Sequence, residues 1–136
     1  MLDLKPHLHE PDTLGLLALS VYPDPARLER ARRQYQERGH WLLGLEEGGH
    51  VVGLIGLELT GPGRATIQHI GVRPDCRNQG TGRKLIDGAI IQLGLDTLQA
   101  ETDADAARFY ERCGFAVTSL GEVYPGVERF RAVRTT

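Results

Sequence analysis

Seven segments of the chain show the alternation of apolar and polar residues, or the short apolar runs, that predict β-strands. Glycine-containing turns at 46–50 and 61–63 separate three successive segments, which predicts an antiparallel meander over residues 41–72. The predicted strands cover residues 2–4, 41–45, 51–59, 65–72, 97–101, 115–120 and 127–133.

Four other segments place apolar residues at helical spacing. Asp24 is a favourable N-cap and Pro25 suits the first helical position, while Gly94 closes a later helix. The predicted helices cover residues 11–21, 25–39, 85–93 and 103–113. Strands and helices therefore mix along the chain, and the fold class is expected to be mixed α/β.

Length and charge narrow the possible functions. The chain has 136 residues and contains no linker or repeat, which predicts a single domain over residues 1–136. The net charge of −2 excludes a global basic field for nucleic acid. No apolar stretch has the length of a bilayer span, and the N-terminal segment lacks the apolar core of a signal peptide. We expect a cytoplasmic protein that binds neither nucleic acid nor membrane.

The sequence gives no sign of a metal site. The two cysteines, Cys76 and Cys113, are far apart and have no histidine partner at metal-ligand spacing. His7 and His9 lack a third ligand and are expected to lie in an exposed tail. We therefore expect free thiols, no metal and no covalent acyl-cysteine step.

Chemistry is concentrated where a predicted strand meets a glycine-containing loop and a helix. Between Arg73 and Lys84 there are four basic residues and one acidic residue. A helix N-terminus offers unpaired backbone N–H groups, and glycines let an anion approach them closely. The segment lacks the third glycine of a dinucleotide fingerprint, and Arg83 follows Gly82 where a Walker loop needs lysine. A small anionic ligand fits the segment better than either nucleotide motif.

Two motifs in this chain resemble those of the GCN5-related N-acetyltransferase (GNAT) family. The first is R-x-x-G-x-G, from Arg77 to Gly82, which follows the strand end Ile70-Gly71-Val72. The second runs from Asp103 to Phe115 and is similar to N-x-x-A-x-x-[FL]-Y-x-x-x-G-F, with Asp103 at the position of the amide. The order of elements also resembles the family, with the weakest fit before Asp24.

The resemblance implies a fold and a co-substrate. The fold would be a central, mostly antiparallel sheet with a splayed parallel strand pair, flanked by about four helices. The co-substrate would be acetyl-CoA or another acyl-CoA, lying between strands 67–72 and 97–101. Backbone groups of β-strand residues would pair with the pantetheine arm, and loop N–H groups would hold the pyrophosphate. The implied cofactor-binding residues are Ile70, Gly71, Val72, Arg77, Asn78, Gln79, Gly80, Thr81, Gly82 and Asp103.

Three of these residues and two cations beside them have specific expectations. A side chain at Gly80 or Gly82 is expected to occupy the space that the pyrophosphate needs. Asp103 either contacts the cofactor arm or caps the helix that follows it. Arg83 and Lys84 add positive charge that either faces the phosphates or is solvated.

The chemistry of acyl transfer requires a base for the amine and an acid for the leaving thiolate. By the family pattern Tyr110 is the acid, and the alternative is a core tyrosine packed beside Phe109. Glu101, at the end of a splayed strand, is the first choice for the base. His69, Glu58 and a water chain remain alternatives. Strand alternation puts His69 on the face away from Ile70 and Val72.

The function expected from the resemblance is an N-acetyltransferase in which a primary amine attacks acetyl-CoA directly in a ternary complex. The alternatives are a catalytically silent acyl-CoA-binding module and, on residues 77–84 alone, a nucleotide-binding domain. The acceptor would be a small-molecule or peptide amine, and the turn Tyr124-Pro125-Gly126 could line its pocket or be a bare turn. The protein is expected to be a monomer or a homodimer.

Overall fold

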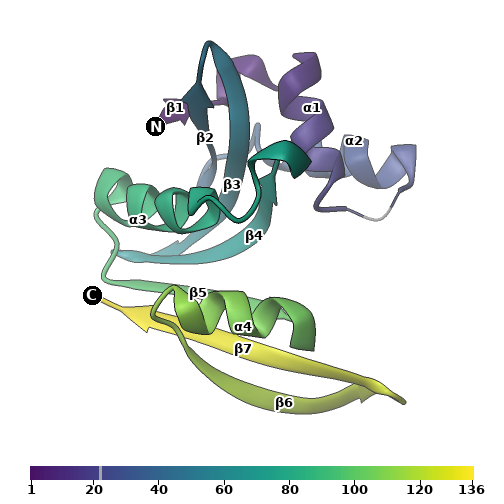
Figure 1. Ribbon diagram of the computed structural model, residues 1–136, viewed down its shortest axis with the longest axis vertical. Coiled ribbons are helices and arrows are strands. Elements are labelled where there is room, and N and C mark those ends of the chain that lie inside the picture. Colours follow the sequence, from purple (N-terminus) through teal and green to yellow (C-terminus); the bar gives the residue numbers. More distant parts are fainter. Residues whose placement is uncertain (22) are drawn as a thin grey trace.

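The computed structural model describes residues 1–21 and 23–136, which form a seven-stranded sheet with helices on both faces (Figure 1). The strand order is β1-β2-β3-β4-β5-β7-β6, and only β4 and β5 are parallel neighbours. The strands are β1 (Leu2–Asp3), β2 (His40–Glu47), β3 (His50–Gly61), β4 (Arg64–Val72), β5 (Thr97–Thr102), β6 (Ala116–Tyr124) and β7 (Val127–Thr135). This mixed, mostly antiparallel architecture confirms the predicted fold class.

The helices lie close to their predicted places. They are α1 (Pro11–Ala18), α2 (Pro25–Gln34), α3 (Thr81–Leu93) and α4 (Ala104–Arg112), with short 3₁₀ turns at Lys5–His7 and Pro74–Cys76. The prediction for α1 was wrong at its C-terminal end, because the helix stops at Ala18 and not at residue 21. The prediction for α2 was also wrong at its C-terminal end, because the helix stops at Gln34 and not near Gly39. The backbone N–H groups of Gln36 and Glu37 bond carbonyls three residues back, at 3.0 and 3.1 Å, and these turns lead the chain into β2.

The two faces of the sheet have separate hydrophobic cores. Helices α3 and α4 cover one face, where Leu85, Ile86 and Tyr110 pack with strand residues such as Ile55 and Leu98. Helices α1 and α2 cover the other face over β2 to β4, where they bury residues including Leu16, Leu17, Tyr35, Leu42 and Leu54. Each burial removes apolar surface from water, and together they fix the helices against the sheet.

Strands β4 and β5 pair over only a short distance. Their register runs through Arg64↔Thr97, Ala65↔Leu98 and Thr66↔Gln99, after which they separate. A β-bulge lies at the same point, because Ile67 and His69 of β4 oppose consecutive residues of β3 and leave Gln68 unmatched. Figure 1 shows the halves of the sheet diverging from this point. The predicted splay between 67–72 and 97–101 is therefore present, although the first three residues of β5 are still paired.

Candidate active site

The loop that leads into α3 is held by its own side chains. Arg73 Nε donates to Asp75 Oδ1 at 2.6 Å, and the hydroxyl of Thr81 donates to the Cys76 carbonyl at 3.3 Å. Asn78 has a φ of +61° and Gly80 a φ of +79°, so both occupy the left-handed region. Asparagine and glycine tolerate this conformation best, which explains how the sequence makes so tight a turn here.

The N-terminus of α3 is left uncapped. Gly80 supplies no side-chain cap, and the first N–H with a partner inside the helix is that of Lys84, which bonds the Gly80 carbonyl at 3.0 Å. The N–H groups of Thr81, Gly82 and Arg83 donate to no described acceptor. Unpaired N–H groups at the positive end of a helix dipole form a site for an anion.

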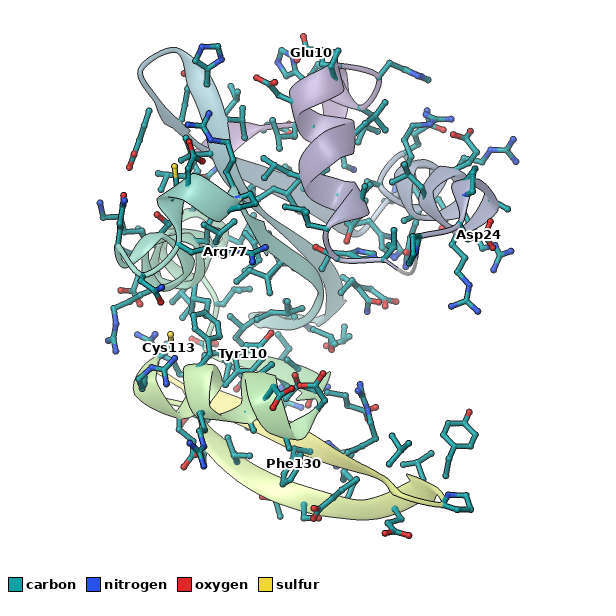
Figure 2. All side chains as sticks on the ribbon, turned by 45° about the vertical axis from the view of Figure 1, so that its right-hand side comes forward. Glu10, Asp24, Arg77, Tyr110, Cys113 and Phe130 are labelled. Atoms are coloured by element: carbon teal, nitrogen blue, oxygen red, sulfur yellow. The ribbon has the colours of Figure 1, made fainter. Side chains whose placement is uncertain are left out.

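A pocket of about 610 Å³ adjoins this helix end. Three guanidinium-bearing residues, Arg77, Arg83 and Arg112, line it, and no aspartate or glutamate of the described chain does. Arg83 also donates to the backbone carbonyl of Arg112, which joins α3 to the end of α4. Figure 2 shows Arg77 beside α3 and Cys113 at the end of α4. Lys84, which the sequence had offered as a second cation, is not among the lining residues.

Apolar groups form the rest of this pocket. They come from Ile70, Val72 and Phe109, together with Leu19 from the segment after α1. The pocket volume lies within the usual range for ligand sites, and its mixture of cationic and apolar walls suits a ligand with a polyanionic head and a less polar arm. The predicted cofactor residues that line it are Ile70, Gly71, Val72, Arg77, Asn78, Gly80, Thr81 and Gly82.

The backbone of β4 presents free donors to the splay. Arg73 N–H bonds the Val52 carbonyl at 2.8 Å, so by antiparallel alternation Gly71 and His69 direct their backbone groups toward β3. Ile70 and Val72 then direct theirs away from β3. The Ile70 carbonyl accepts from Ser20 Oγ at 3.1 Å and the Val72 carbonyl from Arg77 Nε at 3.3 Å, while their N–H groups have no described partner.

Glycine is needed at different positions of the site for different structural reasons. A methyl group at Gly80 would meet nothing within 4 Å, so its positive φ is what requires glycine. At Gly82 a methyl group would lie 2.7 Å from Phe109 Cε1 of α4, and at Gly71 it would lie 2.8 Å from the Leu16 carbonyl of α1. A side chain at Gly82 would therefore meet Phe109, and the expectation that it would also occupy pyrophosphate space stays a prediction.

Asp103 caps α4. Its Oδ1 accepts the backbone N–H of Ala106 at 2.9 Å, which satisfies one of the unpaired donors at the start of the helix. Asp103 lines neither the pocket beside α3 nor a smaller one at the closed end of the splay between β4 and β5. Of the two expectations for this residue, the structure shows the helix cap.

Tyr110 lies on the side of α4 that faces the rest of the molecule (Figure 2). Its ring is buried in edge-to-face contact with Phe109 and Phe115, with ring centroids 5.2 and 5.1 Å away. Burial, followed by the nearby Cys113 and Asp103, raises the pKa of the Tyr110 hydroxyl to about 12. The hydroxyl has no described hydrogen-bond partner, so it is a protonated group whose donor is free.

The three candidate bases each have a partner of their own. Glu101 is more than half exposed and pairs with Arg131 of β7 at 3.5 Å. Glu58 accepts a hydrogen bond from Gln68 at 3.1 Å, and His69 shares one with the hydroxyl of Tyr35. Burial lowers the pKa of the His69 imidazole. The predicted face of His69 is confirmed, because it meets Tyr35, the C-cap of α2, whereas Ile70 and Val72 pack on the other core.

A second, smaller pocket lies at the closed end of the splay. Its volume is about 250 Å³, and Glu101 is the one candidate base that lines it. Gln68, Gln99 and Arg131 also line it, and the sequence had not singled them out. Only the pairing of β5 with β7 and with β4 brings them together, and no local motif signals such contacts.

Of the other predicted residues, Gln79 and Tyr110 line neither pocket. Cys76 and Cys113 are both free and line the larger pocket, and burial is the main reason that the pKa of Cys113 is raised. The turn Tyr124-Pro125-Gly126 lies at the exposed tip of the β6–β7 hairpin and lines neither pocket. In residues 1–21 and 23–136, no cluster of three or more metal-ligating side chains occurs. None of the helices described has the length and apolar character to cross a membrane.

Solved structures of known proteins share this fold. The E. coli ribosomal-protein-S18-alanine N-acetyltransferase shares the fold with a TM-score of 0.74 and 23% identity, over 92% of this chain and 86% of that one. A GNAT family acetyltransferase from Elizabethkingia anophelis, with acetyl-CoA bound, gives 0.71 and 18%, over 94% and 93%. A Bacillus subtilis acetyltransferase in complex with CoA gives 0.67 and 22%, over 90% of each chain.

The sequence itself matches a family model, although it matches none of the curated proteins. The family model described as "Acetyltransferase (GNAT) family" matches residues 7–115, which include the loop, the helix α3 and both motifs. The chain therefore belongs to the GNAT family, and it is an acetyl-CoA-dependent N-acetyltransferase.

Proposed function

We propose that the protein transfers the acetyl group to a primary amine that attacks acetyl-CoA directly within a ternary complex. The observation that carries this proposal is the position of the two pockets on β4. The larger pocket touches Ile70–Val72 and the smaller one touches 66–68, with one residue between them. A thioester arm along the first and an amine in the second would meet beside the bulge at Gln68.

The larger pocket is the proposed site for CoA. The N–H groups from Arg77 to Gly82 would hold the pyrophosphate, with Arg83 and Arg112 adding charge that no carboxylate in the pocket cancels. The N–H groups of Ile70 and Val72 would donate hydrogen bonds to the amide carbonyls of the pantetheine arm, which would lie beside β4 like an added strand. The backbone and loop shape around the ligand would come from Gly71, Asn78, Gln79 and Thr81. Asp103 would offer the ligand only its second carboxylate oxygen, because the first one caps α4.

The proposed reaction needs two proton transfers. The amine nitrogen forms a bond to the thioester carbonyl carbon, the carbon–sulfur bond breaks, and its electron pair leaves on sulfur. Tyr110, protonated because its pKa is about 12, would give its proton to that thiolate. Glu101 would take the proton that the amine loses, because it is the one candidate base at the smaller pocket. The products are the N-acetyl amine and CoA with a free thiol, and the proton on Glu101 returns to Tyr110 through solvent, which restores both groups.

The test is an assay of acetyl-CoA with a panel of primary amines, in which mass spectrometry detects the acetylated product. This readout avoids thiol reagents, which would react with Cys76 and Cys113 in the pocket. CoA is expected to raise the melting temperature where ATP does not, because only a ligand of the folded state stabilises it. Bound CoA with no product from any amine would contradict the proposed function.

A further inference from the structure

The smaller pocket has a lining that selects among amines. The last parallel pair, Thr66↔Gln99, closes one end of the pocket, and Gln68 comes from the bulge in β4. Glu101 and Arg131 are directly paired across β5 and β7 and form its charged wall. One carboxylate and one guanidinium make the pocket neutral overall, in contrast to the cationic pocket beside α3.

The two glutamines of this pocket are oriented by internal hydrogen bonds. The Gln68 Nε2 amide donates to Glu58 Oε2 at 3.1 Å, and the Gln99 Nε2 amide donates to Thr66 Oγ1 at 3.1 Å. The side-chain carbonyl oxygens of both residues have no described partner. Together with the Glu101 carboxylate they make a set of acceptors, and an ammonium group carries three donors.

The guanidinium of Arg131 is the one cationic group described in this pocket. It contacts Glu101 at 3.5 Å, with both side chains half exposed, so the pair is weak and can open to a ligand. Arginine binds carboxylates with two parallel hydrogen bonds, which a carboxamide cannot accept in the same way. A ligand that places an ammonium near Glu101 and a carboxylate near Arg131 would match both charges.

We infer that the acetyl acceptor is a free amino acid, with its amine held among Gln68, Gln99 and Glu101 and its carboxylate on Arg131. This inference rests on the proposed function and names its substrate class. The pocket volume of about 250 Å³ suits a ligand of this size. A peptide N-terminus, whose first carbonyl is an amide, lacks the group that Arg131 would bind.

The test compares each common amino acid with its own carboxamide as acceptor. For the preferred amino acid, kcat/KM should exceed that of the carboxamide by about tenfold or more, since a charge-assisted pair is lost. Arg131→Gln should bring the ratio close to one, because KM should rise for the amino acid and much less for its carboxamide. Arg129→Gln removes the same charge from the same strand outside the pocket, and it should leave the ratio unchanged.

Two outcomes separate this inference from the proposed function. If carboxamides or carboxylate-free amines are acetylated as well as amino acids, and Arg131→Gln affects both alike, the substrate class is wrong while the proposed function stands. If no amine is acetylated although CoA binds, the proposed function fails. Calorimetric titration of the same amino acids into the CoA-bound protein then tests the site alone: binding that Arg131→Gln abolishes supports an amino-acid site in the smaller pocket, and no binding overturns it.

Discussion

The hydroxyl of Tyr35 is hydrogen-bonded to Nδ1 of His69, and this contact joins the C-terminal end of α2 to the splayed part of β4. Gly56 of β3 makes room for it, because a methyl group there would lie 2.8 Å from Tyr35 Cε1. Gly56 is also the register partner of His69. One helix end, one glycine and one histidine thus meet on β4 beside the proposed acyl-transfer site.

The first prediction concerns this hydrogen bond. Tyr35→Phe leaves the ring in place but removes the partner of His69 Nδ1, so we expect the free energy of unfolding to fall by about 1 to 3 kcal/mol. Urea unfolding of the wild type and the variant measures it. Tyr124→Phe, at the exposed hairpin tip, is the matched control and should change nothing. An equally stable Tyr35→Phe protein would show that the bond contributes nothing net.

A second prediction follows from the burial of His69. Burial lowers its pKa, so below about pH 6.5 the unfolded chain binds a proton that the folded protein does not. The free energy of unfolding should therefore be highest above that pH and should fall as the pH drops toward the folded-state pKa. Melting temperatures between pH 8 and 5 should show a smaller fall for His69→Gln than for the wild type. His50→Gln, at an exposed position, should follow the wild type.

Gly80 and Gly82 are the two glycines of the motif, but the protein should respond differently to their substitution. Gly82→Val drives a side chain into Phe109, so we expect a loss of about 1 to 3 kcal/mol in stability from overpacking. Gly80→Asn keeps a residue that tolerates positive φ and points into open space, so the fold should survive while CoA affinity falls. Thermal melts and CoA titrations of both variants measure the two effects. Normal stability of Gly82→Val would contradict the packing role.

The local parts of this site could be predicted from the sequence. The glycine loop, the Asp24 cap, which accepts the Ala26 N–H at 2.9 Å, and the start of α4 at Asp103 all depend on neighbours in sequence. Strand alternation also predicted the face of His69. The bulge at Gln68 lies before that residue, so residues 69–72 alternate between the two faces without interruption.

The remaining parts depend on contacts between distant segments. Phe109 meets Gly82 only because α4 packs on α3, and Arg131 meets Glu101 only because β7 inserts beside β5. Neither contact follows from periodicity, which places a side chain on a face but does not choose its neighbour across the fold. The end of α2 was missed for a related reason, since turns into β2 stop the helix before its pattern of residues ends.

Asp103 provides a test of cap against cofactor contact. Asparagine and aspartate cap helices about equally well, so Asp103→Asn should keep the melting temperature, whereas Asp103→Ala should cost about 1 kcal/mol. If the residue also contacts the CoA arm, Asp103→Asn should tighten CoA binding, because an amide can donate where a carboxylate cannot. Unchanged CoA affinity in both variants would leave Asp103 with the capping role alone.

The last prediction concerns the proposed acid. Tyr110→Phe keeps the buried ring between Phe109 and Phe115 and removes a hydroxyl that has no described partner, so stability should change little. Without that proton donor the thiolate must leave unprotonated or take a proton from water, and kcat should fall by about 10² to 10⁴ with CoA affinity retained. Because the pKa of Tyr110 is about 12, the hydroxyl stays protonated through the neutral range, and the activity loss should not depend on pH there. Single-turnover rates with the best acceptor, compared with CoA titrations, separate chemistry from binding. Full single-turnover activity in Tyr110→Phe would show that another group protonates the sulfur, even with the acetyltransferase activity intact.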